Sequence, residues 1–185
     1  LSRLLGLMTS CLLLAACTGI STPTSSPAGT ALEPTNAHGW ATIQKVGTRF
    51  TDGFETLDVV SEPVEVTSVR FGGGEGGLKL VGYELVPSPR KLASIQLLKG
   101  FPPKDARLPD ARVPSGGQLK VDPTGQGYQL LLGIEVTAPG RWTRNSLIVG
   151  YTSSGTPYEQ TFDAELTVCT PAFVDAEGEC PFPDR

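Results

Sequence analysis

Short apolar runs alternate with polar residues along most of this chain, and turn signals rich in Gly and Pro recur about every ten residues. No long amphipathic helical pattern and no alternation of strands with helices is evident. These observations predict an all-β fold, a two-sheet sandwich of immunoglobulin-like or fibronectin-type architecture with about seven to eight strands. A small open barrel is the alternative that the same pattern allows.

The clearest strand signals lie between residues 127 and 169. From 128 to 136 five apolar side chains alternate with other residues, which places them on one face of a strand because successive Cβ atoms point to opposite faces. Leu131 is the one apolar residue out of step. Two further strands are expected over 146–151 and 158–169, so the block predicts three antiparallel strands joined by turns that contain Gly and Pro.

The chain before this block gives weaker signals. Residues 39–60 carry apolar residues at spacings of three or four, which fit a helix, whereas an Asp52-Gly53 pair fits a hairpin turn between two short strands. We favour the hairpin. Further strands are expected over 64–71, 78–86, 92–98 and 119–121.

A glycine run at Gly72–Gly77 formally contains the pattern G-x-G-x-x-G. A dinucleotide site requires a helix after this pattern, because the helix N-terminus binds the pyrophosphate. A predicted strand follows here instead. The run is therefore interpreted as a hairpin connection rather than a phosphate site.

Composition excludes several kinds of site. The 185 residues suffice for one domain, and their net charge of −4 argues against nucleic-acid binding. The single histidine, His38, rules out a metal site built on several imidazoles within one chain. His38 also lies at the edge of the domain, where a Ser-His-Asp arrangement is not expected. The sequence thus predicts a protein that is not an enzyme.

The first 16 residues have the features of an export signal, with Arg3 followed by an apolar run. The run ends in Leu14-Ala15-Ala16-Cys17, which resembles the lipobox of bacterial lipoproteins. The resemblance implies cleavage before Cys17, a thioether-linked diacylglyceryl group on its sulfur and, in the family, a fatty acyl group such as palmitate on the new amino terminus. Two or three chains would hold the protein stably on the outer side of a cell membrane. An ordinary cleaved signal is the alternative.

The expected domain organisation follows from this start. Residues 17–38 are rich in Ser, Thr and Pro, and we expect a disordered tether because little of this segment can be buried. The sandwich domain is expected over 39–170 and a short tail over 171–185. In an envelope with two membranes, Thr18 after the lipid-bearing cysteine would permit transfer to the outer membrane.

Cys169 and Cys180 remain in the mature domain after the lipid-bearing cysteine is set aside. Export to an oxidising compartment predicts a disulfide between them. The bond would close a loop of about a dozen residues, which is worth about 3 kcal/mol, and would pin the tail. A pair of metal-binding thiolates is the alternative, but no further Cys or His ligand lies nearby in the sequence.

Two short segments could bind something. Asp175, Glu177 and Glu179 could offer three oxygens to Ca²⁺, although the full calcium-loop pattern is absent and a solvated acidic loop is the alternative. The segment Arg141-Trp142-Thr143-Arg144 is predicted to lie in a turn. Arg141, Trp142 and Arg144 could bind an acidic polymer or a partner protein by stacking and charge, or Trp142 could cover the end of the sandwich.

The function that these features favour is a non-catalytic binding or assembly module, lipid-anchored on the extracytoplasmic side of a membrane. Its expected partner is another envelope protein or a polymer. A carrier of a small ligand or a metal ion, with Ca²⁺ at 175–179, is the alternative. An envelope hydrolase is a third hypothesis.

Overall fold

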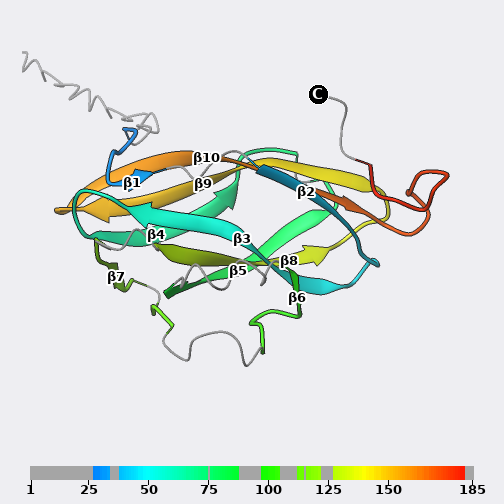
Figure 1. Cartoon of the computed structure of the whole chain (residues 1–185), viewed down its shortest axis with the longest axis horizontal. Coiled ribbons are helices and arrows are strands. Elements are labelled where there is room, and N and C mark those ends of the chain that lie inside the picture. Colours follow the sequence, from blue (N-terminus) through cyan, green and yellow to red (C-terminus); the bar gives the residue numbers. More distant parts are fainter. Residues whose placement is uncertain are drawn as a thin grey trace, which may run out of the picture.

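A computed structural model of the chain describes residues 27–33, 38–74, 76–87, 97–104, 112–114, 116–121 and 127–181. The predicted lipobox and signal lie outside the described residues. All regular structure within the described ranges is β-strand, so the predicted all-β class is confirmed. The strands form two sheets whose ribbons curve over one another (Figure 1).

The first sheet, called here the β9 sheet, has the strand order β2-β10-β9-β4-β7. Its strands are β2 (His38–Ile43), β4 (Val64–Phe71), β7 (Gln118–Leu119), β9 (Arg141–Ser153) and β10 (Thr156–Cys169). All of its neighbours pair antiparallel except β2 and β10, which are parallel.

The second sheet, called the β8 sheet, has the order β1-β3-β8-β5, and β6 also pairs with β3. Its strands are β1 (Leu32–Glu33), β3 (Arg49–Val59), β5 (Leu78–Pro87), β6 (Leu97–Lys99) and β8 (Tyr128–Val136). All of its pairings are antiparallel.

The core lies between the sheets and is built from the predicted apolar faces. Leu132 and Ile134 of β8 are fully buried in it, as are Val149 of β9 and Leu166 of β10. Leu131, which breaks the alternation, is also fully buried, in a second cluster with Val86 and Leu98. The exception in the pattern therefore marks a strand that is covered on both faces.

The expected hairpin in residues 39–60 is wrong, and so is the helical alternative. β2 ends at Ile43 and β3 begins at Arg49, so the chain turns before Asp52-Gly53. The two strands do not pair with each other, because β2 joins the β9 sheet and β3 joins the β8 sheet. Asp52-Gly53 lies inside β3, at a bulge where the register with β8 shifts between Asp52 and Glu55.

The glycine run also differs from the expectation. β4 and β5 lie in different sheets, so the 72–77 segment crosses from one sheet to the other and is not a hairpin. The Trp142 ring lies against Gly76 and Gly77, where any Cβ atom would overlap it. The absence of side chains therefore serves close packing.

The N-terminal boundary of the domain is earlier than expected. Ala31 and Leu32, placed by the sequence in the disordered tether, are 3% and 2% exposed, and Leu32 pairs with Val59 of β3. Gly29 lies against the Tyr151 hydroxyl, where a side chain would collide. Residues 27–33 therefore belong to the fold, because small residues allow a close approach and Leu32 fills the core.

Candidate functional site

A charged cluster lies buried between the two sheets. The Arg144 side chain has no exposed surface, and its Nη1 and Nη2 atoms lie 2.9 Å from Asp52 Oδ2 and 2.9 Å from Glu55 Oε1. The Arg144 Nε–H donates to the Ala164 carbonyl at 2.8 Å. Because Arg144 belongs to β9 and the two carboxylates to β3, this triad joins the sheets.

Two local irregularities allow the triad to form. The bulge in β3 lies between Asp52 and Glu55, and bulges redirect side chains because two residues oppose one on the partner strand. A second register shift, between Asp163 and Leu166 of β10, lies opposite Arg144 and includes Ala164, whose carbonyl accepts the third bond. One guanidinium therefore holds both carboxylates.

The structure corrects two parts of the prediction for Arg141, Trp142 and Arg144, the turn and the surface position of Arg144, whereas partner binding by Arg141 and Trp142 stays a prediction. The segment is the start of β9 rather than a turn, and Arg144 faces the interior. Trp142 is partly buried, and its Nε1–H donates to the Ala138 carbonyl at 3.1 Å. Arg141 alone is exposed. Within this segment, Trp142 packs against Gly76 and Gly77, and Arg144 links the two sheets.

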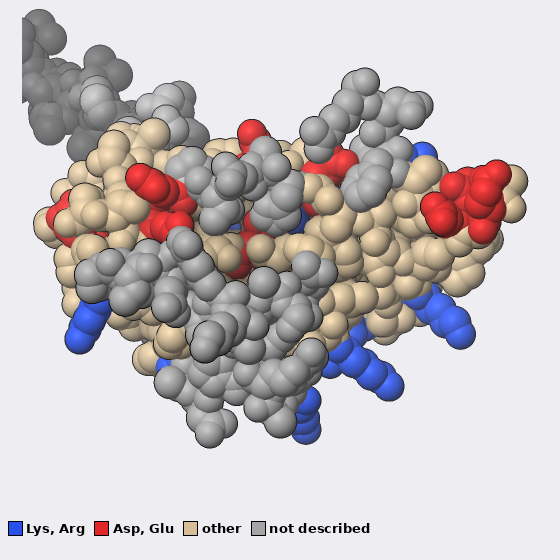
Figure 2. Space-filling model, in the orientation of Figure 1, with Lys and Arg blue, Asp and Glu red and all other residues tan. Residues whose placement is uncertain are grey.

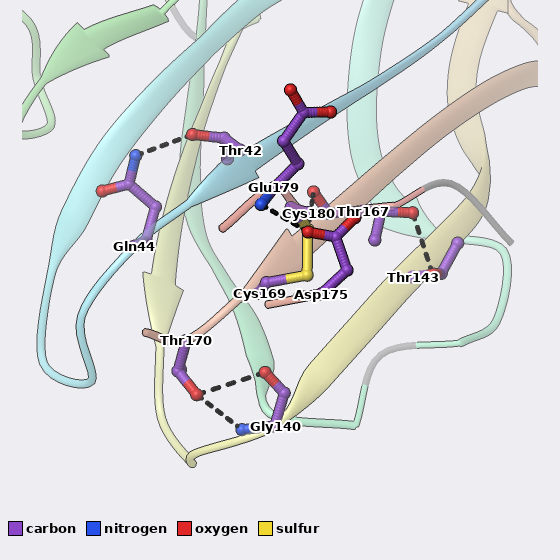
Figure 3. The surroundings of a disulfide bond; sticks show 10 residues. All are labelled: Thr42, Gln44, Gly140, Thr143, Thr167, Cys169, Thr170, Asp175, Glu179 and Cys180. Atoms are coloured by element: carbon purple, nitrogen blue, oxygen red, sulfur yellow. Dashed lines mark hydrogen bonds between the residues drawn. A yellow bond between two sulfur atoms is a disulfide. The ribbon is translucent and has the colours of Figure 1, made fainter. Parts of the chain in front are cut away.

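The disulfide between Cys169 and Cys180 is confirmed, with the two Cα atoms 5.5 Å apart (Figure 3). It closes a loop from the end of β10. At the start of this loop three hydrogen bonds join Thr170 to Gly140. The Thr170 N–H donates to the Gly140 carbonyl at 2.8 Å, and the Thr170 Oγ1 accepts from the Gly140 N–H at 2.9 Å and donates to the same carbonyl at 3.3 Å. We call residues 170–181 the disulfide loop.

A tight turn shapes the far end of the disulfide loop. Asp175 Oδ1 accepts from the Glu179 N–H at 2.7 Å, and the Asp175 N–H donates to the Glu179 carbonyl at 2.9 Å. The Asp175 carboxylate is thus engaged in the turn, whereas Glu177 and Glu179 are exposed. In the described ranges no three His, Cys, Asp or Glu side chains gather as a metal site, so calcium binding here stays a prediction.

An open groove of about 570 Å³ runs between β2 and the disulfide loop. Gly39 to Ile43 line one side, and Gly178, Glu179 and Cys180 line the other. β2 is the outer strand of its sheet and, in the described part of the chain, pairs with β10 alone. Behind it the Trp40 ring stacks on Phe54, with centroids 4.5 Å apart.

A smaller cavity of about 190 Å³ lies beside Val66, Tyr83, Glu84 and Arg112. Arg112 Nη1 and Glu84 Oε2 lie 3.5 Å apart, and neither atom has a hydrogen-bond partner among the described residues. The Tyr83 hydroxyl donates to the Val66 carbonyl at 3.4 Å, and burial raises the pKa of Tyr83. This cavity therefore presents one carboxylate and one guanidinium group, which form an ion pair.

No protein-family model matches the chain, and a comparison with curated proteins finds no relative. No helix in the described ranges has the length and hydropathy needed to cross a bilayer.

Proposed function

We propose that this protein is an extracytoplasmic lipoprotein, held to the membrane through Cys17, whose domain is a non-catalytic binding or assembly module. The lipobox Leu14-Ala15-Ala16-Cys17 supports the anchor. The disulfide supports an oxidising location, because such bonds rarely persist in reducing compartments.

An immunoglobulin-like fold is part of this proposal. The order β1-β3-β8-β5 corresponds to strands A, B, E and D of that fold, and β10-β9-β4 to G, F and C. The pattern departs from it at β7, which pairs with β4 but follows β5 along the chain. Such domains serve many unrelated functions, so the fold supports a binding role without identifying the partner.

The observation that carries the binding role is the groove beside β2. It combines an outer strand with a wall that the disulfide fixes to β10. The charged groups of the core, by contrast, are already engaged with each other: Arg144 holds Asp52 and Glu55 out of contact with solvent. The surface, rather than a reacting centre, is therefore the functional part of the domain.

Two measurements test the proposal on the full chain in membranes. Mass spectrometry of the mature amino terminus is expected to find a diacylglyceryl group on Cys17, and Cys17→Ala is expected to release the protein. A photo-crosslinking amino acid at Ile43, beside the groove, is expected to capture a defined partner. The same group at Val60 is the control, because Val60 is similarly exposed (39% against 42%) but does not line the groove. An unmodified Cys17, or equal capture from both positions, contradicts the proposal.

A second candidate, carriage of a small polar ligand, is favoured by the cavity at Glu84 and Arg112. Both side chains retain buried atoms without hydrogen bonds, which a ligand with one donor and one acceptor would satisfy. Native mass spectrometry of the purified protein tests this function. A bound small molecule that is lost in Arg112→Leu supports it, and a mass equal to that of the lipidated chain alone argues against it.

A further inference from the structure

We propose that the free edge of β2 receives an extended, positively charged polypeptide segment from another protein, which pairs with β2 as an added strand of the β9 sheet. This inference rests on the proposed binding function and specifies the mode of binding and the chemistry of the partner.

The backbone of β2 offers hydrogen-bonding groups on its open side. The Gln44 N–H donates to the Cys169 carbonyl at 2.9 Å, which fixes the side of the chain that faces β10. Because backbone groups alternate along a strand, the N–H and C=O groups of Gly39, Ala41 and Ile43 point away from β10. No described residue pairs with them. An added strand would satisfy these donors and acceptors.

β2 also lacks the features that normally protect sheet edges. β1 and β7 are two residues long, and the outer strand β5 carries Lys79, Glu84, a register shift after Leu80 and a final Pro87. Short length, charge, bulges and proline all discourage strand addition. β2 has six residues, an unbroken register with β10, and no proline or acidic, Lys or Arg side chain.

The dimensions of the groove suit an extended chain. The five lining residues from Gly39 to Ile43 extend over about 16 Å at about 3.3 Å per residue, which matches a peptide of about five residues. Gly39 has no side chain and Ala41 has only a methyl group, so neither adds bulk beside the strand, and Ile43 is 42% exposed at its end.

Charge selects the kind of partner. Glu179 lines the groove and Glu177 is exposed on the same loop, whereas none of the described residues that line the groove is Lys or Arg. Figure 2 shows acidic side chains gathered at the end of the molecule where Figure 1 draws the disulfide loop. A basic segment would meet a complementary wall. A second copy of this chain would bring together two acidic loops on chains of net charge −4, so another protein is the favoured occupant.

The test uses the full, detergent-solubilised chain and a synthetic peptide, Lys-Thr-Val-Thr-Val-Thr-Val-Lys, with a matched peptide that has glutamate at both ends. Ala41→Pro removes an outward N–H and no bond to β10, a change that outer strands tolerate. Ala41→Ser is the control, because it keeps the N–H. The lysine peptide is expected to bind the wild type. Its affinity for Ala41→Pro should be about tenfold lower, as expected for the loss of one hydrogen bond, and its affinity for Ala41→Ser should lie within about twofold of the wild-type value.

Hydrogen exchange gives a second readout that needs no variant. The amides of Ala41 and Ile43 are expected to exchange more slowly when the lysine peptide is added, and the glutamate peptide is expected to have little effect. Equal binding of the two peptides, unchanged binding to a folded Ala41→Pro variant, or unchanged exchange would overturn strand addition. Concentration-dependent dimerisation that Ala41→Pro abolishes would also overturn it, since the occupant would then be a second copy. The Ile43 crosslink can still succeed in those cases, so the broader binding function is tested separately.

Discussion

Arg144 and Asp52 form an ion pair at 2.9 Å in which neither side chain is exposed, although the two residues are 92 positions apart in the chain. Under the proposed immunoglobulin-like assignment, their strands β9 and β3 take the places of F and B, which antibody domains join by a disulfide packed against an aromatic residue of strand C. Here the Phe71 ring of β4 lies 5.9 Å from the guanidinium carbon. The charged triad links the two sheets beside this ring.

We expect Arg144→Met to lower the free energy of unfolding by about 3–5 kcal/mol, because it leaves the carboxylates of Asp52 and Glu55 buried without their cation. Urea denaturation at neutral pH measures this loss. Arg49→Met is the matched control. Arg49 pairs with Glu135 at 3.0 Å on the surface, where its side chain is 58% exposed, and its loss should cost less than about 1 kcal/mol.

A triple variant, Arg144→Met with Asp52→Leu and Glu55→Leu, should recover most of that stability. It leaves no buried charge, although the Ala164 carbonyl loses the bond from Arg144 Nε. The same denaturation experiment applies. A triple variant no more stable than the single one would show that the charges are not the cause of the loss.

We expect Cys169→Ala with Cys180→Ala to lower the free energy of unfolding by about 3 kcal/mol, the value for closing a loop of this length. The disulfide loop should then be cleaved by protease faster than the rest of the domain, because its turn at Asp175–Glu179 would no longer be fixed to β10. Limited proteolysis followed by mass spectrometry measures this. Equal cleavage rates with and without the disulfide would contradict the prediction.

We expect Gly77→Ala to destabilise the fold by about 1–3 kcal/mol, since its new methyl group would overlap the Trp142 indole. Gly77 does not have a positive φ, so backbone strain does not contribute to this loss; Gly47→Ala, at φ +80° in open space, shows the effect of strain without a clash. Combining Gly77→Ala with Trp142→Ala should give less than the sum of the two single effects. Additive effects would mean that the two residues are not in contact.

Burial raises the pKa of both Tyr83 and Tyr151 above the ordinary value of 10.0, and at Tyr151 the backbone groups of Ala31 and Leu32 oppose the shift. The folded protein then keeps phenolic protons that the unfolded chain has lost, so the stability they contribute is complete below about pH 10 and falls as the pH rises further. Urea denaturation between about pH 8 and pH 11 should show this decline. The decline should be shallower in Tyr83→Phe with Tyr151→Phe, and an unchanged slope would contradict the prediction.

Much of the sandwich could be predicted from local alternation. The apolar face of 128–136 was sufficient to predict β8, and Val64–Phe71 is found as β4 with the expected bounds. The expected export to an oxidising compartment, together with the two remaining cysteines, was sufficient to predict the disulfide between Cys169 and Cys180. These features depend on residues close together in sequence, or on two cysteines with no other partner in the domain.

The triad and the groove could not be predicted because they depend on distant residues. Asp52-Gly53 has the local chemistry of a turn, and its use as a bulge depends on Arg144 from another sheet. Arg144 likewise resembles a surface residue until its partners are known. The available signal for a buried ion pair was the presence of charged residues, Asp52 and Glu55 among them, between the apolar residues of 50–59.

The parallel alignment of β2 with β10 has a mechanical consequence. Opposite ends of these two strands lead toward the two termini of the chain, so tension applied between the termini pulls the strands along their length in opposite directions. The hydrogen bonds between β2 and β10 are then loaded together in shear, so they do not break one after another. A pull between the two ends of the chain would therefore be resisted at this pair of strands.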